Sequence, residues 1–199
     1  ATGARFLNLI DGVYSPSPPP ETQPPDRLDN HAWGRLIETT ERVVDMTREK
    51  FGLQVAFHPC AETHVEYEDQ IESLLDRTDP DRLSLCLDTG HHAYRGGDPV
   101  DFFRRHHDRI SYLHLKSVDG DLQQRVNAEN VPLHNAVDQG VFCEPAKGSV
   151  DFAGLGAVLR QVGWSGIAMV EQDMFHPPHA FPLPNAVRSI EHYRSSGIG

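Results

Sequence analysis

Short apolar runs alternate with longer amphipathic segments along this chain. The apolar runs predict five buried strands, at Arg5–Ile10, Leu53–Phe57, Leu83–Leu87, Ile110–Leu115 and Ile167–Val170. The segments between them carry apolar residues at helical spacing and predict helices over about 30–51, 68–77, 99–107, 150–162 and 184–193. Strands that alternate with helices in this way pair in parallel through right-handed crossovers. The pattern therefore predicts an α/β fold built on a parallel sheet.

The number of strands predicts a (β/α)8 TIM barrel that is only partial. A closed barrel has eight strands and typically about 250 residues, whereas this chain has 199. At roughly 30 residues per βα unit, three N-terminal units are expected to be missing. Residues 1–199 are therefore interpreted as a single domain, the C-terminal portion of a TIM barrel.

Two long connections interrupt the alternation. The proline-rich segment Tyr14–Asp29 predicts a loop, because proline fixes φ and removes a hydrogen-bond donor. The polar segment Ser117–Ser149 predicts a long connection with one or two short helices. We interpret its part 119–147 as a lid or a substrate-selecting loop, with an oligomer contact or a disordered insertion as the alternatives.

Four of the predicted strands end on a residue that can bind a metal ion: His58, Asp88, His114 and Glu171. The C-terminal ends of barrel strands meet at one mouth, so we expect these side chains to converge there. Mixed carboxylate and imidazole donors suit a divalent ion such as Mn²⁺, Co²⁺, Mg²⁺ or Zn²⁺. One such residue alone is more often a cap or a hydrogen-bonding group, so the prediction depends on the repeated placement.

Composition narrows the class of partner. The formal net charge of -11 disfavours nucleic acid, which is bound through clustered Lys and Arg. No apolar run is long enough to cross a membrane, and no signal peptide is visible. The three cysteines lack CxxC spacing and favour reduced thiols. We expect a cytoplasmic protein with a small-molecule substrate, and a homo-oligomer is left open.

Five segments, in this order, resemble the sugar phosphate isomerase/epimerase superfamily, the xylose isomerase-like TIM-barrel group: His58-Pro-Cys-Ala-Glu-Thr-His-Val-Glu66, Leu87-Asp-Thr-Gly-His91, His114-Leu-Lys116, Gly140-Val-Phe142 and Val170-Glu-Gln-Asp173. Within the group, the Gly-Val-Phe and Glu-Gln-Asp segments are most similar to inosose dehydratase-like proteins. The likeness extends from about Phe6 to Tyr193. The combination is specific to the superfamily but poor at choosing a substrate.

The resemblance implies a metal site at Asp88, His114 and Glu171, with His91 in contact with substrate oxygens. The fourth ligand in the family is usually a glutamate, and here it is left open between His58 and Glu66.

Two further positions depart from the family pattern. Ser117 stands where relatives commonly carry aspartate, with Asp119 as a candidate substitute. Cys60 stands where a second histidine is frequent.

These residue types support proton transfer next to a carbonyl group. A divalent ion that bridges the carbonyl and the adjacent hydroxyl of a keto sugar acts as a Lewis acid and stabilises an enediolate. Glu171 is our candidate base, and Glu66 or His58 would return the proton in an isomerisation or epimerisation. In a dehydration, His91 or Lys116 would protonate the departing hydroxyl.

Besides His91, three residues outside the metal set are expected to contact the substrate. Lys116 is expected either to bind a substrate hydroxyl or to pair with a carboxylate. Asp173 is expected either to orient the substrate or to support Glu171. Arg125, in the long polar segment, is a third expected substrate contact.

We therefore expect a metal-dependent isomerase or epimerase that acts on a keto sugar or sugar phosphate. An inosose dehydratase-type lyase acting on a cyclitol is the first alternative. A truncated barrel without catalytic function is the second. A nuclease on the same fold is disfavoured by the net charge.

Overall fold

A five-stranded parallel sheet organises the protein, in the order β1 (Phe6–Leu9), β2 (Gln54–Phe57), β3 (Leu83–Asp88), β4 (Ile110–Leu115) and β7 (Ile167–Val170). The structure is a computed structural model that describes residues 3–12 and 27–199. The sheet curves into half of a TIM barrel, and all five predicted strands are present. Most of the predicted loop Tyr14–Asp29 lies outside the described residues.

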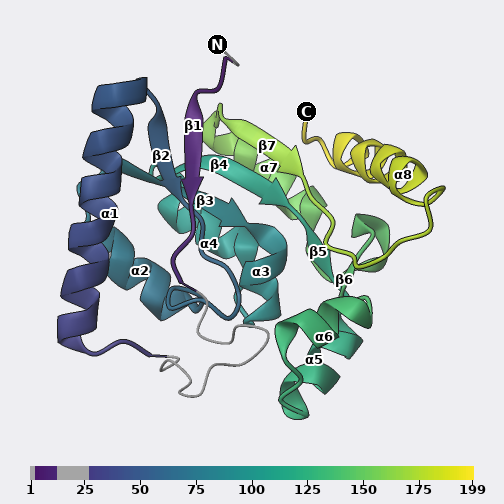
Figure 1. Cartoon of the computed structure of the whole chain (residues 1–199). Coiled ribbons are helices and arrows are strands. Elements are labelled where there is room, and N and C mark those ends of the chain that lie inside the picture. The colour runs from purple at the N-terminus through teal and green to yellow at the C-terminus, as the bar shows by residue number, and fades with distance from the viewer. Residues whose placement is uncertain (1–2, 13–26) are drawn as a thin grey trace.

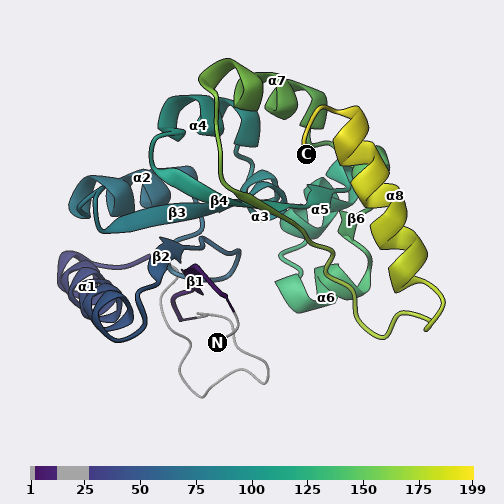
Figure 2. The same cartoon turned by 90° about the horizontal axis from the view of Figure 1, so that it is seen from above.

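The helices between the strands cover the outer, convex face of this half-barrel (Figure 1, Figure 2). They and the final helix are α1 (Asn30–Phe51), α2 (Glu68–Arg77), α4 (Pro99–His106), α7 (Phe152–Val162) and α8 (Pro182–Ser195). Asp98 caps α4, because its Oδ1 accepts from Val100 N at 2.9 Å and Pro99 is the first helical residue. The alternation of parallel strands and helices that the sequence predicted is therefore present in the structure.

The side chains of β3 show how the fold separates core from site. Leu83, Leu85 and Leu87 are buried in the apolar core together with residues of the covering helices. Strand geometry turns every second side chain to the opposite face. Cys86 and Asp88 therefore point into the concave face. Because the alternation continues to the C-terminal end of the strand, its last residue, Asp88, places a buried carboxylate on the concave face.

The connection after β4 folds back onto the sheet. A two-stranded antiparallel hairpin pairs β5 (Ser117–Val118) with β6 (Phe142–Cys143). One or two short helices were predicted here, and two are present between these strands, α5 (Gly120–Ala128) and α6 (Leu133–Asp138). The 3-10 turn η1 (Pro145–Lys147) follows. The hairpin itself was not predicted. It returns Phe142 to the C-terminal edge of the sheet.

One helix after β3 was not predicted. No helix was expected between this strand and residue 99, but α3 (Thr89–Tyr94) begins at once, with Asp88 as its N-cap. Five of the six residues of α3 are buried. The helix is too short for a period to show in the sequence, and contacts with the rest of the chain stabilise it.

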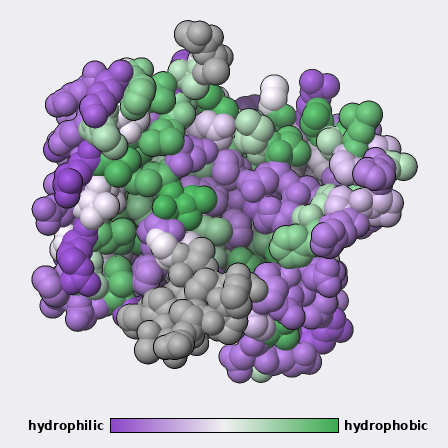
Figure 3. Space-filling view, viewed as in Figure 1, coloured by the Kyte–Doolittle hydropathy of each residue, from purple (hydrophilic) through white to green (hydrophobic). Residues whose placement is uncertain are grey.

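The face of the molecule seen in Figure 3 is mixed in character. Hydrophobic surface lies between α1 and β1, and hydrophilic residues lie nearer the centre of the view (Figure 3). A groove of about 340 Å³ follows the α1–β1 side, with Leu9, Leu36, Val43 and Phe57 among its lining residues. None of the described helices combines the length and apolarity needed to cross a bilayer.

Candidate active site

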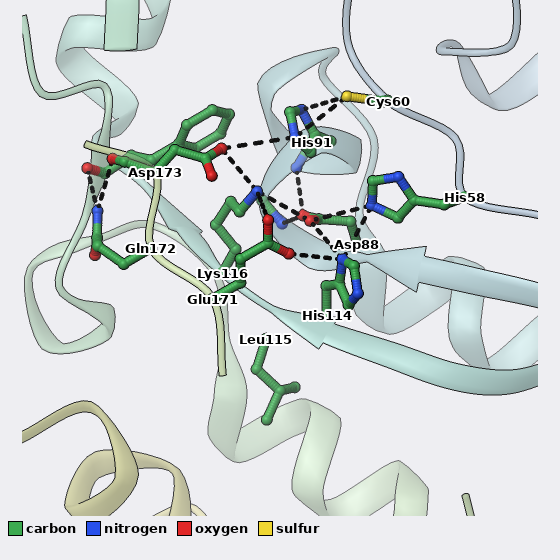
Figure 4. A network of polar contacts seen from close by, with 12 residues as sticks. His58, Cys60, Asp88, His91, His114, Leu115, Lys116, Glu171, Gln172 and Asp173 are labelled. Carbon is green, nitrogen blue, oxygen red and sulfur yellow. Dashed lines mark hydrogen bonds and ion pairs between the residues drawn. The ribbon is translucent and has the colours of Figure 1, made fainter. Parts of the chain in front are cut away.

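Four strand-end residues converge on one point of the concave face (Figure 4). His58 and Glu171 directly follow β2 and β7, and their backbone N–H groups still donate to the neighbouring strands β1 and β4. Asp88 and His114 lie opposite each other in the β3–β4 ladder. One donor atom from each of the four residues lies within 4.8 Å of those of the others. The parallel register thus brings together the four residues predicted to bind a metal.

His114 is at the centre of this group. Its Nδ1 lies 2.6 Å from Glu171 Oε2, 3.1 Å from His58 Nε2 and 3.5 Å from Asp88 Oδ2. Burial opposes protonation of the ring, but contacts with Asp88, Cys86 and Glu171 raise the pKa of His114 to about 12. Cys86 Sγ forms a second close set of donors with the two histidines.

The two carboxylate oxygens of Asp88 have separate roles. Oδ1 accepts from Gly90 N at 2.9 Å and from His91 N at 2.8 Å, so it caps α3. Oδ2 faces His58, His114 and Lys116. Burial alone would raise the pKa of Asp88, but the charge of Lys116 and the neighbouring histidines hold it well below its usual value. Asp88 is therefore ionised, and its hydrogen bonds to the start of α3 hold the side chain in place.

Lys116 supplies the opposing positive charge. Its Nζ lies 3.1 Å from Asp88 Oδ2, 3.2 Å from Glu171 Oε1 and 2.8 Å from Asp173 Oδ2. It also lies 5.0 Å from the centre of the Phe142 ring, within range of a cation–π contact. The side chain is 1% exposed. Burial disfavours the charge, but the three carboxylates outweigh it and raise the pKa of Lys116.

The neighbours of Lys116 fix its position from both sides. Thr89 Oγ1 donates to Lys116 O at 2.7 Å and accepts from Lys116 N at 3.0 Å. A Cβ at position 90 would lie 2.5 Å from Lys116 Cγ and 2.8 Å from its Cβ, so the side chain packs directly on Gly90. The Asp-Thr-Gly-His segment therefore contributes three contacts to Lys116. The Asp88 carboxylate pairs with its ammonium group, the Thr89 hydroxyl bonds to its backbone, and Gly90 leaves room for the aliphatic part of its side chain.

His91 presents one ring nitrogen to the site. Ala61 N donates to its Nδ1 at 3.3 Å, which leaves the ring proton of the neutral form on Nε2. That Nε2 lies 3.4 Å from Cys60 Sγ and 3.8 Å from Asp173 Oδ2. Burial and the charge of Lys116 lower the pKa of His91 to about 3. His91 is therefore a neutral hydrogen-bond donor near neutral pH.

Glu66 lies outside the metal-capable group. Its Oε2 accepts from Arg95 Nε at 2.5 Å and from Glu62 N at 2.7 Å. Glu66 is buried in the loop between β2 and α2, outside the group, whereas His58 lies inside the group. The fourth ligand that the sequence left open stays a prediction, and the position of His58 within the group favours it over Glu66.

Two other expected residues lie away from the group. Arg125 is exposed on α5, and no hydrogen bond or ion pair joins its side chain to the group within the described residues. Asp119, the suggested substitute for an aspartate at position 117, caps α5 by accepting from Leu122 N at 2.9 Å. The role of Arg125 in substrate binding stays a prediction.

The structure adds contacts that the sequence did not indicate. Asn8 on β1 reaches across the concave face, and its Nδ2 lies 3.3 Å from His114 Nε2. Phe142 packs edge-on against the His91 ring with centroids 5.0 Å apart. Gln172 Nε2 donates to Phe142 O at 2.8 Å and so ties the end of β7 to the hairpin. A polar residue at the centre of an apolar strand was the one available signal for Asn8.

The fold and the strand-end site place this protein in a known class. The chain belongs to the xylose isomerase-like TIM barrel family, whose sequence model matches residues 1–196. This confirms the resemblance read from the five sequence segments.

Related proteins of this family include dehydratases. An inosose dehydratase of Geobacillus kaustophilus is 34% identical over 179 residues, which are 90% of this chain and 58% of that protein. The rhizopine catabolism protein MocC of Rhizobium meliloti is 35% identical over 156 residues, which are 78% of this chain and 46% of that protein. The chain thus spans about half the length of the relatives it matches.

Solved structures share the fold at low identity. The IolI protein, whose crystal structure contains a zinc atom, gives a TM-score of 0.66 at 15% identity, over 98% of this chain and 62% of that one. The probable 3-DHS dehydratase AsbF of Bacillus anthracis gives 0.69 at 15% identity, over 96% of this chain and 64% of that one. These likenesses support the barrel fold.

Proposed function

We propose that this protein is a metal-dependent enzyme that removes a proton next to the carbonyl group of a keto sugar or cyclitol. The observation that carries the proposal is the convergence of His58, Asp88, His114 and Glu171, with donor atoms within 4.8 Å of one another. The family match and the dehydratase relatives support it.

The residues present fit a divalent ion. Two imidazoles and two carboxylates form the mixed donor set that Zn²⁺, Co²⁺ or Mn²⁺ accepts. Glu171 Oε2 is buried and makes no hydrogen bond, although it lies 2.6 Å from His114 Nδ1. The His114 ring is paired with this oxygen, and a divalent ion would take the place of the proton between them. When bound, such an ion would act as a Lewis acid toward the substrate carbonyl.

The surrounding residues supply the rest of the chemistry. Glu171 stays ionised because contact with His114 and the charge of Lys116 lower its pKa to about 2 against the effect of burial. It is our candidate to take the proton from the carbon next to the carbonyl. The Lys116 ammonium, within 3.2 Å of Asp88 and Glu171, stabilises negative charge that develops on the substrate. His91 Nε2–H orients a hydroxyl group.

Dehydration is the reaction we favour. Loss of the proton to Glu171 leaves an enolate, and the enolate electrons expel the hydroxyl group on the next carbon. That hydroxyl departs as water after it takes a proton from the Lys116 ammonium, because His91 is neutral and can only donate a hydrogen bond. The inosose dehydratase relatives support this reaction. Isomerisation or epimerisation, the first expectation from the sequence, needs a second acid or base, and Glu66 is bound to Arg95 instead.

Metal content and turnover, measured on the same samples, test this proposal. Asp88→Asn and Glu171→Gln are expected to lower bound metal, and Glu171→Gln to lower kcat by about 100-fold or more on a panel of inososes and ketoses. The exposed Glu129→Gln on the surface after α5 is the matched control and should change neither quantity.

Four outcomes are informative. Turnover of an inosose with release of water supports the lyase, and interconversion of ketoses supports the isomerase. Metal content and turnover that stay unchanged in both site variants would contradict the site assignment. Wild-type protein without metal or turnover would support the non-catalytic barrel.

A further inference from the structure

Asn8 is a polar residue at an apolar position. It lies in β1 between Leu7 and Leu9 and on the same side of the strand as Phe6. The Phe6 ring packs edge-on against Tyr112 of β4, with centroids 5.6 Å apart. β1 and β4 are not neighbours in the sheet, so this side of β1 faces β4 across the concave surface.

The amide of Asn8 meets the one ring nitrogen of His114 that points away from the metal-capable group. Asn8 Nδ2 lies 3.3 Å from His114 Nε2, whereas His114 Nδ1 faces Asp88, His58 and Glu171. The other end of the same amide, Asn8 Oδ1, is buried and has no hydrogen-bond partner among the described residues.

When His114 binds a metal ion through Nδ1, the direction of its hydrogen bond with Asn8 must reverse. A neutral ring that gives the Nδ1 lone pair to a metal carries its proton on Nε2. An N–H group on Nε2 cannot bond to the N–H groups of Asn8 Nδ2, but it can donate to Oδ1. The two ends of the amide have nearly the same shape, so a half-turn exchanges them in place. Cys86 also approaches the ring, but a thiol sulfur is a weak acceptor.

We propose that Asn8 is a positioning residue whose Oδ1 accepts the Nε2–H of His114 and holds Nδ1 toward the metal. This inference rests on the proposed metal site. Histidine ligands generally donate their second N–H to an acceptor that fixes the ring, and loss of that acceptor costs about 10- to 100-fold in metal affinity. Asn8 supplies that acceptor from a strand that contributes no metal-binding donor of its own.

Zinc affinity, measured by competition with a chromophoric chelator, tests the inference with two opposed variants. Asn8→Leu removes the acceptor at similar size and should raise the Kd for Zn²⁺ about 10-fold or more. Asn8→Asp can accept but cannot donate, so it should bind zinc at least as tightly as the wild type. If Asn8 instead had to donate to a bare Nε2, Asn8→Asp would weaken binding. Phe6→Leu, on the same side of β1, is the control and should leave the Kd unchanged.

A second readout reports the ring directly. Long-range ¹H–¹⁵N spectra of the zinc-loaded wild type should show His114 Nε2 protonated and Nδ1 bound to metal. A protonated Nδ1 with a bare Nε2, or a folded Asn8→Leu variant with wild-type affinity, would overturn the inference alone. If Asn8→Leu does not fold, Asn8→Asp and the spectra decide. Wild-type protein that takes up no zinc would overturn the proposed metal site as well.

Discussion

Two clusters of charged residues in this molecule have similar composition and opposite surroundings. At the strand ends, Lys116 lies among Asp88, Glu171 and Asp173, and its side chain is 1% exposed. On the outer surface, Arg105 of α4 pairs with three carboxylates of α2 and α4, Glu68, Glu72 and Asp101, and its side chain is 38% exposed.

The difference in exposure between the two clusters bears on whether each is explained by stability or by function. Surface ion pairs are screened by solvent and contribute at most about 1 kcal/mol each. Buried ion pairs lose hydration on folding, and apolar residues of the same size are often as stable. The buried cluster at the mouth of the half-barrel is therefore explained better by the proposed chemistry than by a gain in stability. The surface cluster needs no such explanation.

The largest effect is expected when the buried cation is removed. Lys116→Met leaves Asp88, Glu171 and Asp173 without their common partner and should cost about 3–5 kcal/mol of unfolding free energy in the presence of a chelator. Zinc should restore part of this loss, because the ion would neutralise the same carboxylates. Urea unfolding with and without zinc measures both quantities.

Lys147→Met is the matched control. This lysine also pairs with a carboxylate, Glu144, but its side chain is 70% exposed. Its loss should cost less than about 1 kcal/mol. A Lys116→Met variant as stable as Lys147→Met would remove the distinction between the buried and the surface cluster.

The next effect comes from crowding the buried lysine. In Gly90→Ala, the new methyl group would lie 2.5 Å from Lys116 Cγ, and we expect a loss of about 1–3 kcal/mol together with weaker metal binding. Gly34→Ala adds the same methyl group to α1, where no atom lies within 4 Å, and should stabilise the helix by up to about 1 kcal/mol. Thermal unfolding of the pair checks the sign. Equal stabilisation by both changes would contradict the packing of Lys116 on Gly90.

As the pH falls, protonation of groups in the buried site should lower the free energy of unfolding before protonation of the surface carboxylates does. Burial and the charge of Lys116 lower the pKa of His91 from 6.5 to about 3, so the unfolded chain binds its proton first as the pH falls. Stability is therefore lost below about pH 6.5, by at most about 1.4 kcal/mol per pH unit for one site. Glu171, with its pKa lowered from 4.5 to about 2, adds a loss of the same sign below pH 4.5.

His91→Gln isolates the first of these contributions. Urea unfolding between pH 7 and pH 5 should show a flatter decline in this variant than in the wild type. His134→Gln, at an exposed position of α6, is the control. Parallel curves for the His91 variant and the wild type would contradict a neutral, buried His91.

The smallest effect is expected at the surface cluster. Arg105→Ala removes three ion pairs at once but should cost only about 1 kcal/mol, and less at high salt. Metal content should not change. A loss above about 3 kcal/mol would mean that α2 and α4 depend on this arginine as the strand ends depend on Lys116.

The four predicted metal-binding residues follow from strand periodicity, whereas the role of His91 was implied by the resemblance. His58, Asp88 and Glu171 each come directly after an apolar run, His114 lies one residue before the end of another, and parallel strands align their ends. Contacts between distant segments left no such pattern. The pairing of Glu66 with Arg95 spans 29 positions, and the contact of Asn8 with His114 spans 106.

Short elements were missed for a related reason. β5 and β6 have two residues each, too few to display alternation, and α3 has six. Tertiary contacts decide the conformation of such segments. The sequence therefore predicted the barrel strands and their polar ends better than the parts that close over them.

The most direct test of the account is an anomalous difference map from crystals grown with zinc and recorded at the zinc absorption edge. We predict one strong peak at the strand ends, about 2.0–2.2 Å from His58 Nε2, Asp88 Oδ2, His114 Nδ1 and the Glu171 carboxylate, with Glu66 still on Arg95. A peak ligated by Glu66 in place of His58, or no peak among these four residues, would contradict it.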